Sequence, residues 1–465
     1  MTRFSFVRRS AFVAACLTVM VACNLGTPAP EPPTLEPRPS ATPEPTMGVV
    51  GSGGVSVVMA PIGGTPVPVI GAQQAGADLI NQVEVDRLMN HVDRLQGFYT
   101  RHVNSDMGSD TRGIGAARRY IENEFKLIQQ QGGNLYVFPH EFDLVWNKIQ
   151  TRQENIVAVV QGTEPGAGFL VVGAHYDSVV IPDFTISSAF APGANDNGTG
   201  VAALLEMARI AALNPQRSSI MFVAFSAEEV GRKGSIAFAN YLVNQNVDVF
   251  AMINIDTIGN QDDGKGGVNA SELRVFSNKP NDTPDRQLAR TMEFLSFTQG
   301  QSQGLDVLRL AVQPEIDREQ RYGDHFSFTE KGIPSIRFIN AVEEKINGDP
   351  TDTIEYIEPA YFRRSVQSIL LVMSCMASGP RPPRNLTLRN NNSQLVWEPV
   401  PDAVSYIVAL RYPGNLNYNQ QFEVAGDITS VPYTFSGTSY EGVAVAARGP
   451  DGIVGPLSPE LKINP

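Results

Sequence analysis

The chain has 465 residues, of which 42% are hydrophobic and 18% are charged. This length can bury a large core and predicts more than one domain. Asp and Glu outnumber Lys and Arg by 48 to 36, and the resulting net charge of −12 argues against a nucleic-acid-binding protein, because such a protein needs a basic surface.

The first residues have the pattern of an export signal. A basic start precedes an apolar run at residues 11–22, which is too short to stay in a membrane as a spanning helix. The run ends in VMVAC, which resembles a bacterial lipobox with Met20 where leucine is usual. The resemblance implies that residues 1–22 are a signal peptide and that Cys23 carries a lipid. The protein would then be exported to a bacterial cell surface, anchored to the membrane or secreted. An ordinary secretory signal, cut elsewhere, is the alternative, and the export route stays open.

Residues 23–76 predict a linker. Eight of the 33 prolines lie between Pro28 and Pro45, and such a stretch forms an extended spacer rather than a packed core. It would hold the folded part away from a membrane surface. If Cys16 is removed with the signal peptide and Cys23 is lipidated, Cys375 alone stays free, so stability must come from packing and bound metal rather than from an internal disulfide.

Residues 77–378 predict an α/β domain. Helical spacing marks residues 85–103 and 112–133, and the second segment ends at two glycines. Apolar runs then alternate with helical segments, which indicates a mostly parallel mixed sheet flanked by helices. The expected strands are residues 155–162, 169–175, 219–226, 249–256, 272–277 and 334–340, and a helix is expected at residues 198–214.

Residues 381–465 predict a small all-β sandwich. Short alternating runs separated by turn residues replace the helical pattern here. The segment resembles a fibronectin type III domain through Trp397, Tyr406 and the ending AARGPDGIVGPLSP at residues 446–459. The resemblance implies a domain that spaces or binds, with a surface or a polymer as its ligand. A passive appendage is the alternative.

Several side chains that can bind metal or carry protons follow the predicted strands. Ligands of open α/β sheets bind beyond the carboxyl ends of the strands, so this position predicts a functional site. Taken singly, most of these residues have an ordinary explanation, such as a helix cap, a buried histidine or a turn. They are His175, Asp177, Asp196, Glu228, Glu229, Asp256 and His325.

The adjacent pair Glu228 and Glu229 is the hardest to explain as part of a core. Two neighbouring carboxylates repel each other and lose solvation when they are buried. Cations at the sheet edge would remove that cost, and imidazoles with carboxylates form a plausible zinc ligand set. Together these residues predict a metal site at the carboxyl edge of the sheet.

The order of these residues resembles the co-catalytic zinc exopeptidases, which include secreted bacterial aminopeptidases, aminopeptidase Y and glutamate carboxypeptidase. From His175 to His325 the successive ligand candidates are 21, 33, 27 and 69 residues apart. The similarity covers residues 77–378. The first gap is long for the family, and we interpret residues 178–190 within it as a lengthened loop, which leaves the shape of the substrate pocket open.

The resemblance implies a site that holds two Zn²⁺ ions. Asp196 would bridge the two ions. Glu229 and His325 would complete one ion's ligands, and His175 and Asp256 would complete those of the other.

The two remaining residues would serve catalysis. Asp177 lies two residues beyond His175 on an extended strand, hence on the same side, and would orient the imidazole. Glu228 would act as the general base, taking a proton from water held between the metals and delivering it to the leaving amine. The implied activity is that of an aminopeptidase that cuts the N-terminal bond of a peptide or protein.

Three alternatives stay open. A carboxypeptidase of the same family would need a cation for the terminal carboxylate, and Arg309, Arg318 and Arg321 are either such cations or ordinary surface charges. A glutaminyl cyclase shares the fold but uses one zinc ion. A non-catalytic ectodomain would have kept the fold and lost the metals.

Overall fold

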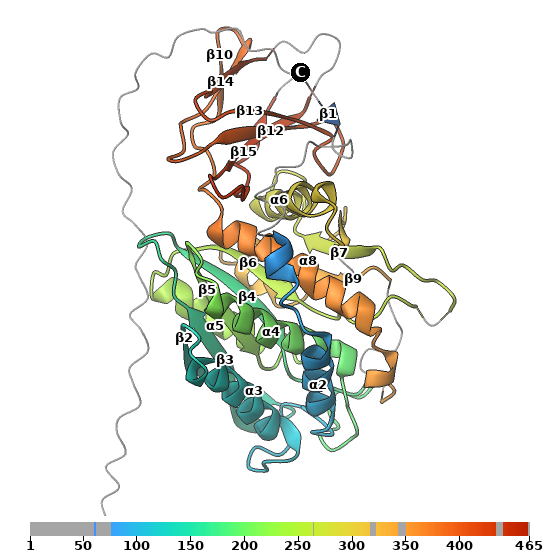
Figure 1. Cartoon of the computed structure of the whole chain (residues 1–465). Helices are drawn as coiled ribbons and strands as arrows, with labels where there is room; N and C mark the ends of the chain where they lie inside the picture. Colours follow the sequence, from blue (N-terminus) through green and yellow to red (C-terminus); the bar gives the residue numbers. More distant parts are fainter. Residues whose placement is uncertain are drawn as a thin grey trace, which may run out of the picture. The chain divides into compact units, whose positions relative to one another are not determined.

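An eight-stranded sheet forms the centre of residues 135–340 (Figure 1). This computed structural model describes residues 60–61, 76–263, 265–316, 322–342, 350–433 and 440–463, which belong to one compact unit. The strand order is β2-β3-β5-β4-β6-β9-β7-β8. The bounds are β2 Leu135–Trp146, β3 Ile149–Val160, β4 Phe169–His175, β5 Ser219–Phe225, β6 Val249–Ile255, β7 Glu272–Ser277, β8 Arg309–Val312 and β9 Ser335–Asn340.

The sheet is mixed, with a parallel centre. β4 pairs in parallel with β5 and β6, and β6 pairs in parallel with β9. The pairs β2–β3, β3–β5 and β7–β9 are antiparallel. The predicted fold class is thereby confirmed. The two edge strands, β2 and β8, were not predicted. Most of β2 is only partly buried or exposed, and β8 has only four residues.

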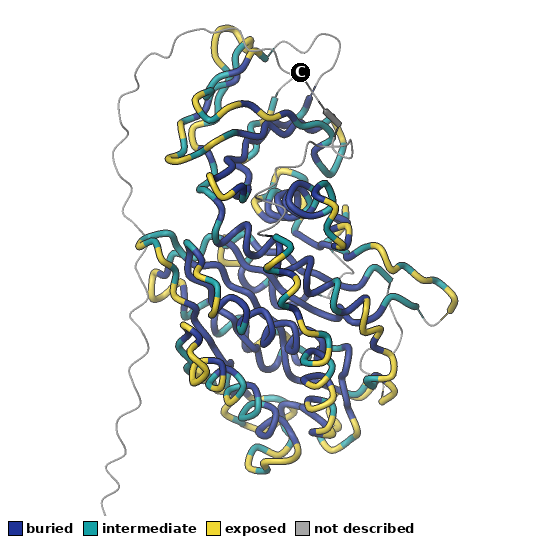
Figure 2. Tube along the Cα trace, viewed as in Figure 1, coloured by how far each residue is buried: buried dark blue, intermediate teal, exposed yellow. Residues whose placement is uncertain are grey.

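The residues of the central strands are buried, and Figure 2 shows these strands as dark blue tube. On β3, Ile156 and Ala158 belong to one hydrophobic core, whereas Val157 and Val159 belong to another. Because successive side chains of a strand point to opposite faces, helices must cover the sheet on both sides. This explains why these strands appear in the sequence as continuous apolar runs.

The helices form two layers around the sheet. The helices α2, α3, α4 and α8 pack with one another over one face, whereas α5 and α7 contribute Phe238 and Phe328 to the core on the other face. The helix α6 packs against α8 and β8. The bounds are α2 Val85–Gln96, α3 Gly113–Gln130, α4 Gly200–Leu213, α5 Lys233–Asn244, α6 Pro284–Gln299, α7 His325–Thr329 and α8 Pro359–Ser378, with short helices η1 Ala194–Thr199, η2 Gln301–Gln303 and η3 Ile354–Tyr356.

The first predicted helix is shorter than expected. It was predicted over residues 85–103, but α2 ends before Gly97, and residues 98–112 form a loop. The following Tyr99 has a φ of 70°, which cannot continue a right-handed helix. The second prediction, residues 112–133, agrees with α3 to within three residues at each end.

The C-terminal region consists of two antiparallel sheets, as the predicted sandwich requires. Trp397 and Tyr406 pack edge to face inside it, with 5.4 Å between their ring centroids. The short strand β1, within the predicted linker, pairs with β13, a pairing that was not predicted. The sheets are β1-β13-β12-β15-β16 and β10-β11-β14, with bounds β1 Ala60–Pro61, β10 Thr387–Arg389, β11 Gln394–Val396, β12 Ser405–Arg411, β13 Gln420–Ala425, β14 Ser430–Pro432, β15 Gly442–Arg448 and β16 Leu461–Lys462.

The larger of these sheets is itself buried on both faces. On β12, Tyr406 and Val408 face the sandwich core, whereas Ile407 and Ala409 join the core that contains α6 and α8. The fully buried Arg290 on α6 donates to the Leu416 carbonyl at 2.5 Å. The sandwich therefore shares a hydrophobic core with the α/β region.

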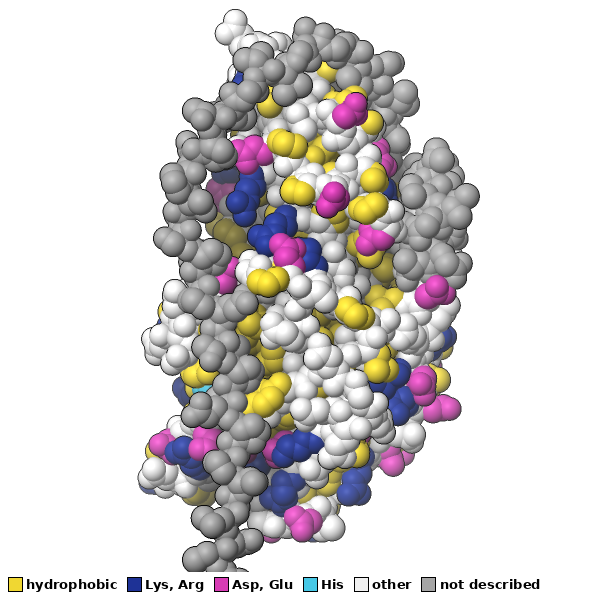
Figure 3. Space-filling view, turned by 60° about the vertical axis from the view of Figure 1, so that its left-hand side comes forward, with side chains coloured by type: hydrophobic (Ala, Val, Ile, Leu, Met, Phe, Trp, Pro, Cys, Tyr) yellow, Lys and Arg dark blue, Asp and Glu magenta, His cyan; other side chains and the backbone are white. Residues whose placement is uncertain are grey.

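Charged side chains of both signs are interspersed on the face seen in Figure 3. Arg152, for example, pairs with Glu141 at 2.5 Å and with Asp143 at 3.2 Å. Cys375 is buried and free, whereas the predicted signal peptide and the predicted lipidation site at Cys23 lie outside the described residues. Within the described ranges, no helix is long and apolar enough to span a bilayer.

Candidate metal centre

Three neighbouring strands carry the predicted ligands to one edge of the sheet. His175 is the last residue of β4, Glu228 and Glu229 follow β5, and Asp256 directly follows β6. Because β5, β4 and β6 are adjacent and parallel, their carboxyl ends meet. Asp196 reaches the same edge from η1, just before α4.

His175, Asp196 and Asp256 form a compact group. The Nε2 atom of His175 lies 3.2 Å from Oδ1 of Asp196 and 3.6 Å from Oδ1 of Asp256. One ligand atom from each of the three lies within 4.8 Å of the others. An imidazole nitrogen with two carboxylate oxygens is a donor set that fits zinc.

Asp177 links this group to the two glutamates. Its carboxylate accepts the backbone N–H of Glu228 at 3.0 Å and that of Glu229 at 3.1 Å. Its Oδ1 atom also lies 3.6 Å from Nδ1 of His175. Burial alone would lower the pKa of His175, but hydrogen bonds with the three surrounding aspartates raise it well above its ordinary value.

Glu228 and Glu229 are costly to ionise without a cation. Burial raises the pKa of both carboxyls well above the ordinary value, and the neighbouring acidic groups raise it further. For Glu228 those neighbours include Asp324, and for Glu229 they include Asp196. This is the electrostatic setting that a bound divalent cation would relieve.

His325 lies at the first position of α7 and is 2% exposed. Burial and two nearby arginines lower its pKa to about 3, so the imidazole is neutral and able to bind metal. Its Nδ1 atom and both carboxylate oxygens of the preceding Asp324 are buried with no hydrogen-bond partner in the described part of the chain.

His325 and Glu229 do not join the compact group of three, so the structure places the five predicted ligands near one edge but clusters only three of them.

Arg337 on β9 was not predicted as a site residue. Its Nε atom lies 3.1 Å from Oδ2 of Asp256, and the residue is 3% exposed. Burial raises the pKa of Asp256, but the Arg337 charge and the His175 hydrogen bond outweigh it and lower the pKa to about 2. The sequence offered no signal for this contact, because Arg337 lies within an apolar strand.

Asp352 holds the backbone around Asp196. Its carboxylate accepts the N–H of Asn195 at 2.8 Å and that of Asp196 at 2.9 Å. Burial raises the pKa of Asp352 to about 7 despite these bonds. The sequence did not reveal this role, because Asp352 lies 156 residues beyond Asp196.

Arg101 is buried and ties together the two chain segments that carry His175 and Asp196. It donates to the carbonyls of Tyr176 at 2.6 Å, Pro192 at 2.5 Å and Gly193 at 2.8 Å. Burial lowers its pKa to about 10, which still leaves the guanidinium charged at neutral pH. Arg101 is therefore a positioning residue, and it falls where the sequence predicted a continuing helix.

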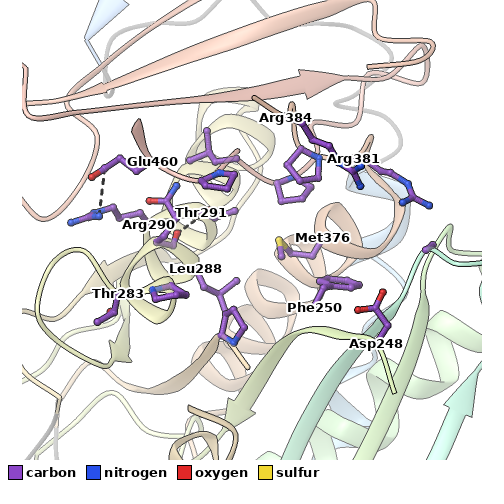
Figure 4. Close-up of a pocket in the computed structure, with 18 of the residues that line it drawn as sticks. Asp248, Phe250, Thr283, Leu288, Arg290, Thr291, Met376, Arg381, Arg384 and Glu460 are labelled. Atoms are coloured by element: carbon purple, nitrogen blue, oxygen red, sulfur yellow. Dashed lines mark hydrogen bonds and ion pairs between the residues drawn. The ribbon is translucent and has the colours of Figure 1, made fainter. Parts of the chain in front are cut away.

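A pocket of about 580 Å³ lies away from this group (Figure 4). Ala167, Arg217, Asp248 and Pro334, which line it, precede β4, β5, β6 and β9. These four residues therefore mark the amino edge of the parallel strands, whereas the predicted metal ligands lie at the carboxyl edge. Phe250, Leu288 and Met376 also line this pocket, on whose rim Arg381 and Arg384 lie.

Comparison with known proteins assigns the chain to a family. Residues 155–373 match Peptidase family M28. A probable zinc metalloprotease of Pyricularia oryzae is 32% identical over 385 residues, which cover 73% of this chain and 75% of the relative. The chain belongs to peptidase family M28. As a member of this family it is a zinc metallopeptidase, and the zinc predicted from the sequence is supported.

A second relative and two solved structures are also similar to this chain. A probable zinc metalloprotease of Leptosphaeria maculans is 29% identical over 357 residues, covering 69% of this M28 chain and 81% of the relative. LapB of Legionella pneumophila matches with a TM-score of 0.53 and 19% identity, over 68% of this chain and 77% of LapB. The LapA aminopeptidase of the same organism matches with a TM-score of 0.51, 19% identity and coverage of 66% and 75%. At such identities the two structures establish the fold.

Of the three arginines considered for the carboxypeptidase alternative, only one lies within the described residues of this M28 peptidase. Arg309 is exposed and forms an ion pair with Glu272, on the neighbouring strand β7. Arg318 and Arg321 lie outside the described residues.

Proposed function

We propose that this M28 peptidase is a two-zinc exopeptidase that removes N-terminal residues from peptides or proteins. The observation that carries the proposal is the convergence of His175, Asp196 and Asp256, with 3.2 and 3.6 Å from the imidazole Nε2 to the two carboxylates. The same edge of the sheet also presents a pair of carboxyls that burial keeps hard to ionise.

Five residues would hold the two ions. Asp196 would be shared, His175 and Asp256 would complete one ion's ligands, and Glu229 and His325 would complete those of the other. The Nδ1 atom of His325 is buried and has no hydrogen-bond partner among the described residues. A buried polar nitrogen needs a partner, so this supports a role for His325 as a metal ligand. Bound zinc would supply a Lewis acid that polarises the scissile carbonyl and acidifies the attacking water.

Glu228 would move the proton. Its raised pKa suits a group that takes a proton from the attacking water and then delivers it to the nitrogen of the leaving amine. Asp177 would act through Glu228 and His175, because it binds the backbone N–H of the former and approaches the imidazole of the latter. It is thus a positioning residue in this scheme.

The charges around the site favour an amine over a carboxylate as the substrate terminus. Arg101 is committed to backbone carbonyls and Arg337 to Asp256, whereas both carboxyl oxygens of Asp324 lack a hydrogen-bond partner among the described residues. A free α-amino group would be attracted by the ionised Asp324 carboxylate, and a terminal carboxylate would be repelled by it. This arrangement supports the aminopeptidase over the carboxypeptidase.

The proposal is tested with purified enzyme, metal analysis and a panel of substrates. We expect two zinc ions per chain, hydrolysis of chromogenic aminoacyl substrates, no hydrolysis of N-acetylated versions, and loss of activity on chelation that zinc restores. One zinc ion together with cyclisation of N-terminal glutamine would indicate the glutaminyl cyclase. Cleavage of C-terminal residues would indicate the carboxypeptidase, and a folded protein without zinc would indicate the non-catalytic ectodomain.

We further propose that the enzyme is exported and lipid-anchored through Cys23. The support is the basic start, the short apolar run and the VMVAC sequence. Metabolic labelling with a fatty acid in a bacterial host should label the chain, and Cys23→Ala should abolish the label. Labelling that survives this substitution would contradict the proposal.

For the C-terminal sandwich, we propose a fibronectin type III-like domain that binds a surface or a polymer. The support is the two-sheet architecture with Trp397 against Tyr406 in its core. This proposal is tested by pull-down on insoluble polysaccharides and peptidoglycan. The retention of the full chain is compared with that of a variant in which surface charges of the sandwich are changed. Equal retention of both proteins on every polymer would contradict it.

A further inference from the structure

The pocket at the amino edge of the sheet, which we call the amino-edge pocket, has the size of a ligand site. Its volume of about 580 Å³ falls within the range of about 300–1,000 Å³ that is typical of small-molecule sites, and such sites often lie between domains. The α/β region contributes Phe250 on β6, Leu288 on α6 and Met376 on α8. The sandwich contributes Leu457 and Lys462. A ligand here would contact both regions, at the sheet edge opposite the proposed zinc centre.

The centre of the amino-edge pocket is apolar. Leu288, Met376 and Leu457 are buried there, and the half-buried Phe250 packs against the main hydrophobic core (Figure 4). Pro334 also lines the pocket. A ligand that covers these side chains removes apolar area from water, which is favourable. The centre of the pocket therefore fits the apolar body of a ligand.

Three of the lining residues are arginines that gather around Glu164. The Arg217 Nη1 atom lies 3.3 Å from Oε2 of Glu164, and the Arg381 Nε–H donates to Oε1 at 3.1 Å. Burial lowers the pKa of Arg217, and the nearby Arg381 lowers it further against the opposing effect of Glu164. Arg384 follows three residues after Arg381, is exposed, and forms no ion pair within the described ranges. One end of the pocket thus holds more guanidinium charge than the shared carboxylate neutralises.

The charge balance of the whole pocket leaves one cation over. Five basic and three acidic side chains line it, and Glu164 behind the arginines is a fourth carboxylate. Asp282 is paired with Lys462 at 2.5 Å, and Glu460 with Arg290 at 3.5 Å, which Figure 4 shows as a dashed line. The surplus positive charge therefore lies at the other end, with the arginines. It stands out in a chain whose net charge is −12.

An apolar centre with one surplus cation at its end fits a ligand whose apolar body ends in an anion. The planar guanidinium group binds a carboxylate through two parallel hydrogen bonds. A carboxylate carries a single charge and would match the surplus. A phosphate monoester carries about −1.5 to −2 charges at pH 7, and its excess would lie near Glu164 and Asp248. The balance of charge favours the carboxylate.

We propose that the amino-edge pocket binds a fatty-acid-like carboxylate, with its chain against Phe250, Leu288 and Met376 and its head group on Arg384. This site is separate from the zinc centre, and the inference does not depend on the proposed peptidase mechanism. Because the ligand contacts the α/β region and the sandwich together, it binds the folded chain and not the unfolded one. Binding therefore stabilises both regions.

The first test is titration calorimetry of the purified protein with laurate, in detergent-free buffer and below the critical micelle concentration. We expect saturable binding of one laurate per chain and a higher thermal midpoint in its presence. Hexanoate, which has a shorter chain, and 1-dodecanol, which has no charge, should each bind at least about tenfold more weakly. Each of these two probes lacks one half of the interaction, so the comparison separates the apolar contact from the charge.

The second test locates the head group with matched variants. Arg384→Gln removes an exposed and unpaired charge, so the fold should be unaffected, and Arg389→Gln on β10 is the control at another exposed arginine. We expect the Kd for laurate to rise about tenfold in Arg384→Gln, which corresponds to about 1.4 kcal/mol, and to stay unchanged in the control. The Kd for 1-dodecanol and the peptidase activity should be the same in both variants.

Four results would overturn the inference. The absence of saturable laurate binding would show that the pocket is not such a site. Equal laurate affinity in Arg384→Gln and Arg389→Gln would place any bound laurate elsewhere. Equal affinity of the wild type for laurate and 1-dodecanol would show that no anion is recognised. Tighter binding of dodecyl phosphate than of laurate would identify the head group as a phosphate.

Discussion

The Asp177 carboxylate accepts the backbone N–H of Glu228 at 3.0 Å. Its second oxygen accepts the N–H of Glu229 at 3.1 Å, so one side chain beyond β4 fixes the backbone that follows β5. The same carboxylate lies 3.6 Å from the imidazole of His175. Asp177 therefore sets the position of the proposed base relative to a proposed ligand.

Replacing Asp177 with asparagine should reduce turnover while the protein still folds. The amide nitrogen cannot accept an N–H, so one of the two backbone bonds is lost together with the charge near His175. Loss of such a supporting group typically costs about 10–100-fold in activity or metal affinity. We expect kcat to fall by that amount, measured with zinc content. Asp110→Asn, at an exposed position, is the control, and equal kcat in the two variants would contradict the role.

Glu228→Gln should keep fold and zinc but lose most turnover. The amide cannot carry a proton from water to the leaving amine, and positioned acid–base catalysis contributes about 10²–10⁴-fold. We expect kcat to fall within this range with KM nearly unchanged, whereas Glu315→Gln, on the surface, should behave as wild type. Near-normal kcat for Glu228→Gln would refute its role as the base.

Arg101→Met should weaken both the fold and the metal site. The substitution leaves the carbonyls of Tyr176, Pro192 and Gly193 buried without their donors. We expect the unfolding free energy to fall by about 2–4 kcal/mol, from urea titrations, because a buried unsatisfied group costs about 1–3 kcal/mol. Zinc affinity should fall as well, and Arg101→Lys should recover part of both losses. A zinc affinity equal to that of Arg389→Met, an exposed control, would show that Arg101 does not position the site.

His91 should make the fold less stable in acid. Burial, aided by Arg87, lowers its pKa from 6.5 to about 4, and its Nδ1 lies 2.7 Å from the Tyr120 hydroxyl. In the unfolded chain His91 becomes protonated near pH 6.5, whereas in the folded chain it stays neutral down to about pH 4. The contribution of the neutral, buried His91 to the unfolding free energy is therefore fully present above pH 6.5 and is lost between pH 6.5 and 4. The loss should approach about 3 kcal/mol, at 1.36 kcal/mol per pKa unit. His91→Gln should flatten the unfolding free energy over this range, and an identical pH dependence in both proteins would contradict the assignment.

A charge at Ala409 should destabilise the whole chain. This residue on β12 is fully buried in the core shared with α6 and α8, so Ala409→Asp places an unpaired carboxylate there at a cost of about 3 kcal/mol or more. We expect a lower thermal midpoint for the α/β region and the sandwich together, by calorimetry. Val404→Asp, at a position 48% exposed, is the control. A sandwich that melts alone while peptidase activity persists would show that it is a passive appendage.

Local pattern was sufficient to predict the main features of the fold. Runs such as residues 169–175 and 219–226 had to be strands covered on both faces, because their apolar residues do not alternate with polar ones. The carboxyl ends of parallel strands meet, so the same reading predicted that His175 and Asp256 lie together, and they do. The edge strands β2 and β8 were not predicted. Most of β2 is only partly buried or exposed, and β8 is only four residues long, so neither has the long, fully apolar run of the central strands.

Contacts between distant parts of the chain were not predictable in this way. Arg101, Arg337 and Asp352 each fix a site segment by a hydrogen bond or ion pair to a residue far away in the sequence. The sequence around a single charged residue in a loop or strand does not indicate which residue it will pair with. The free-energy cost of burying its charge is offset only by the tertiary contact. The sequence by itself thus determined which elements form and which residues stand at their ends. The tertiary structure decided how those ends are held, because only folding brings a buried charge to the group that satisfies it.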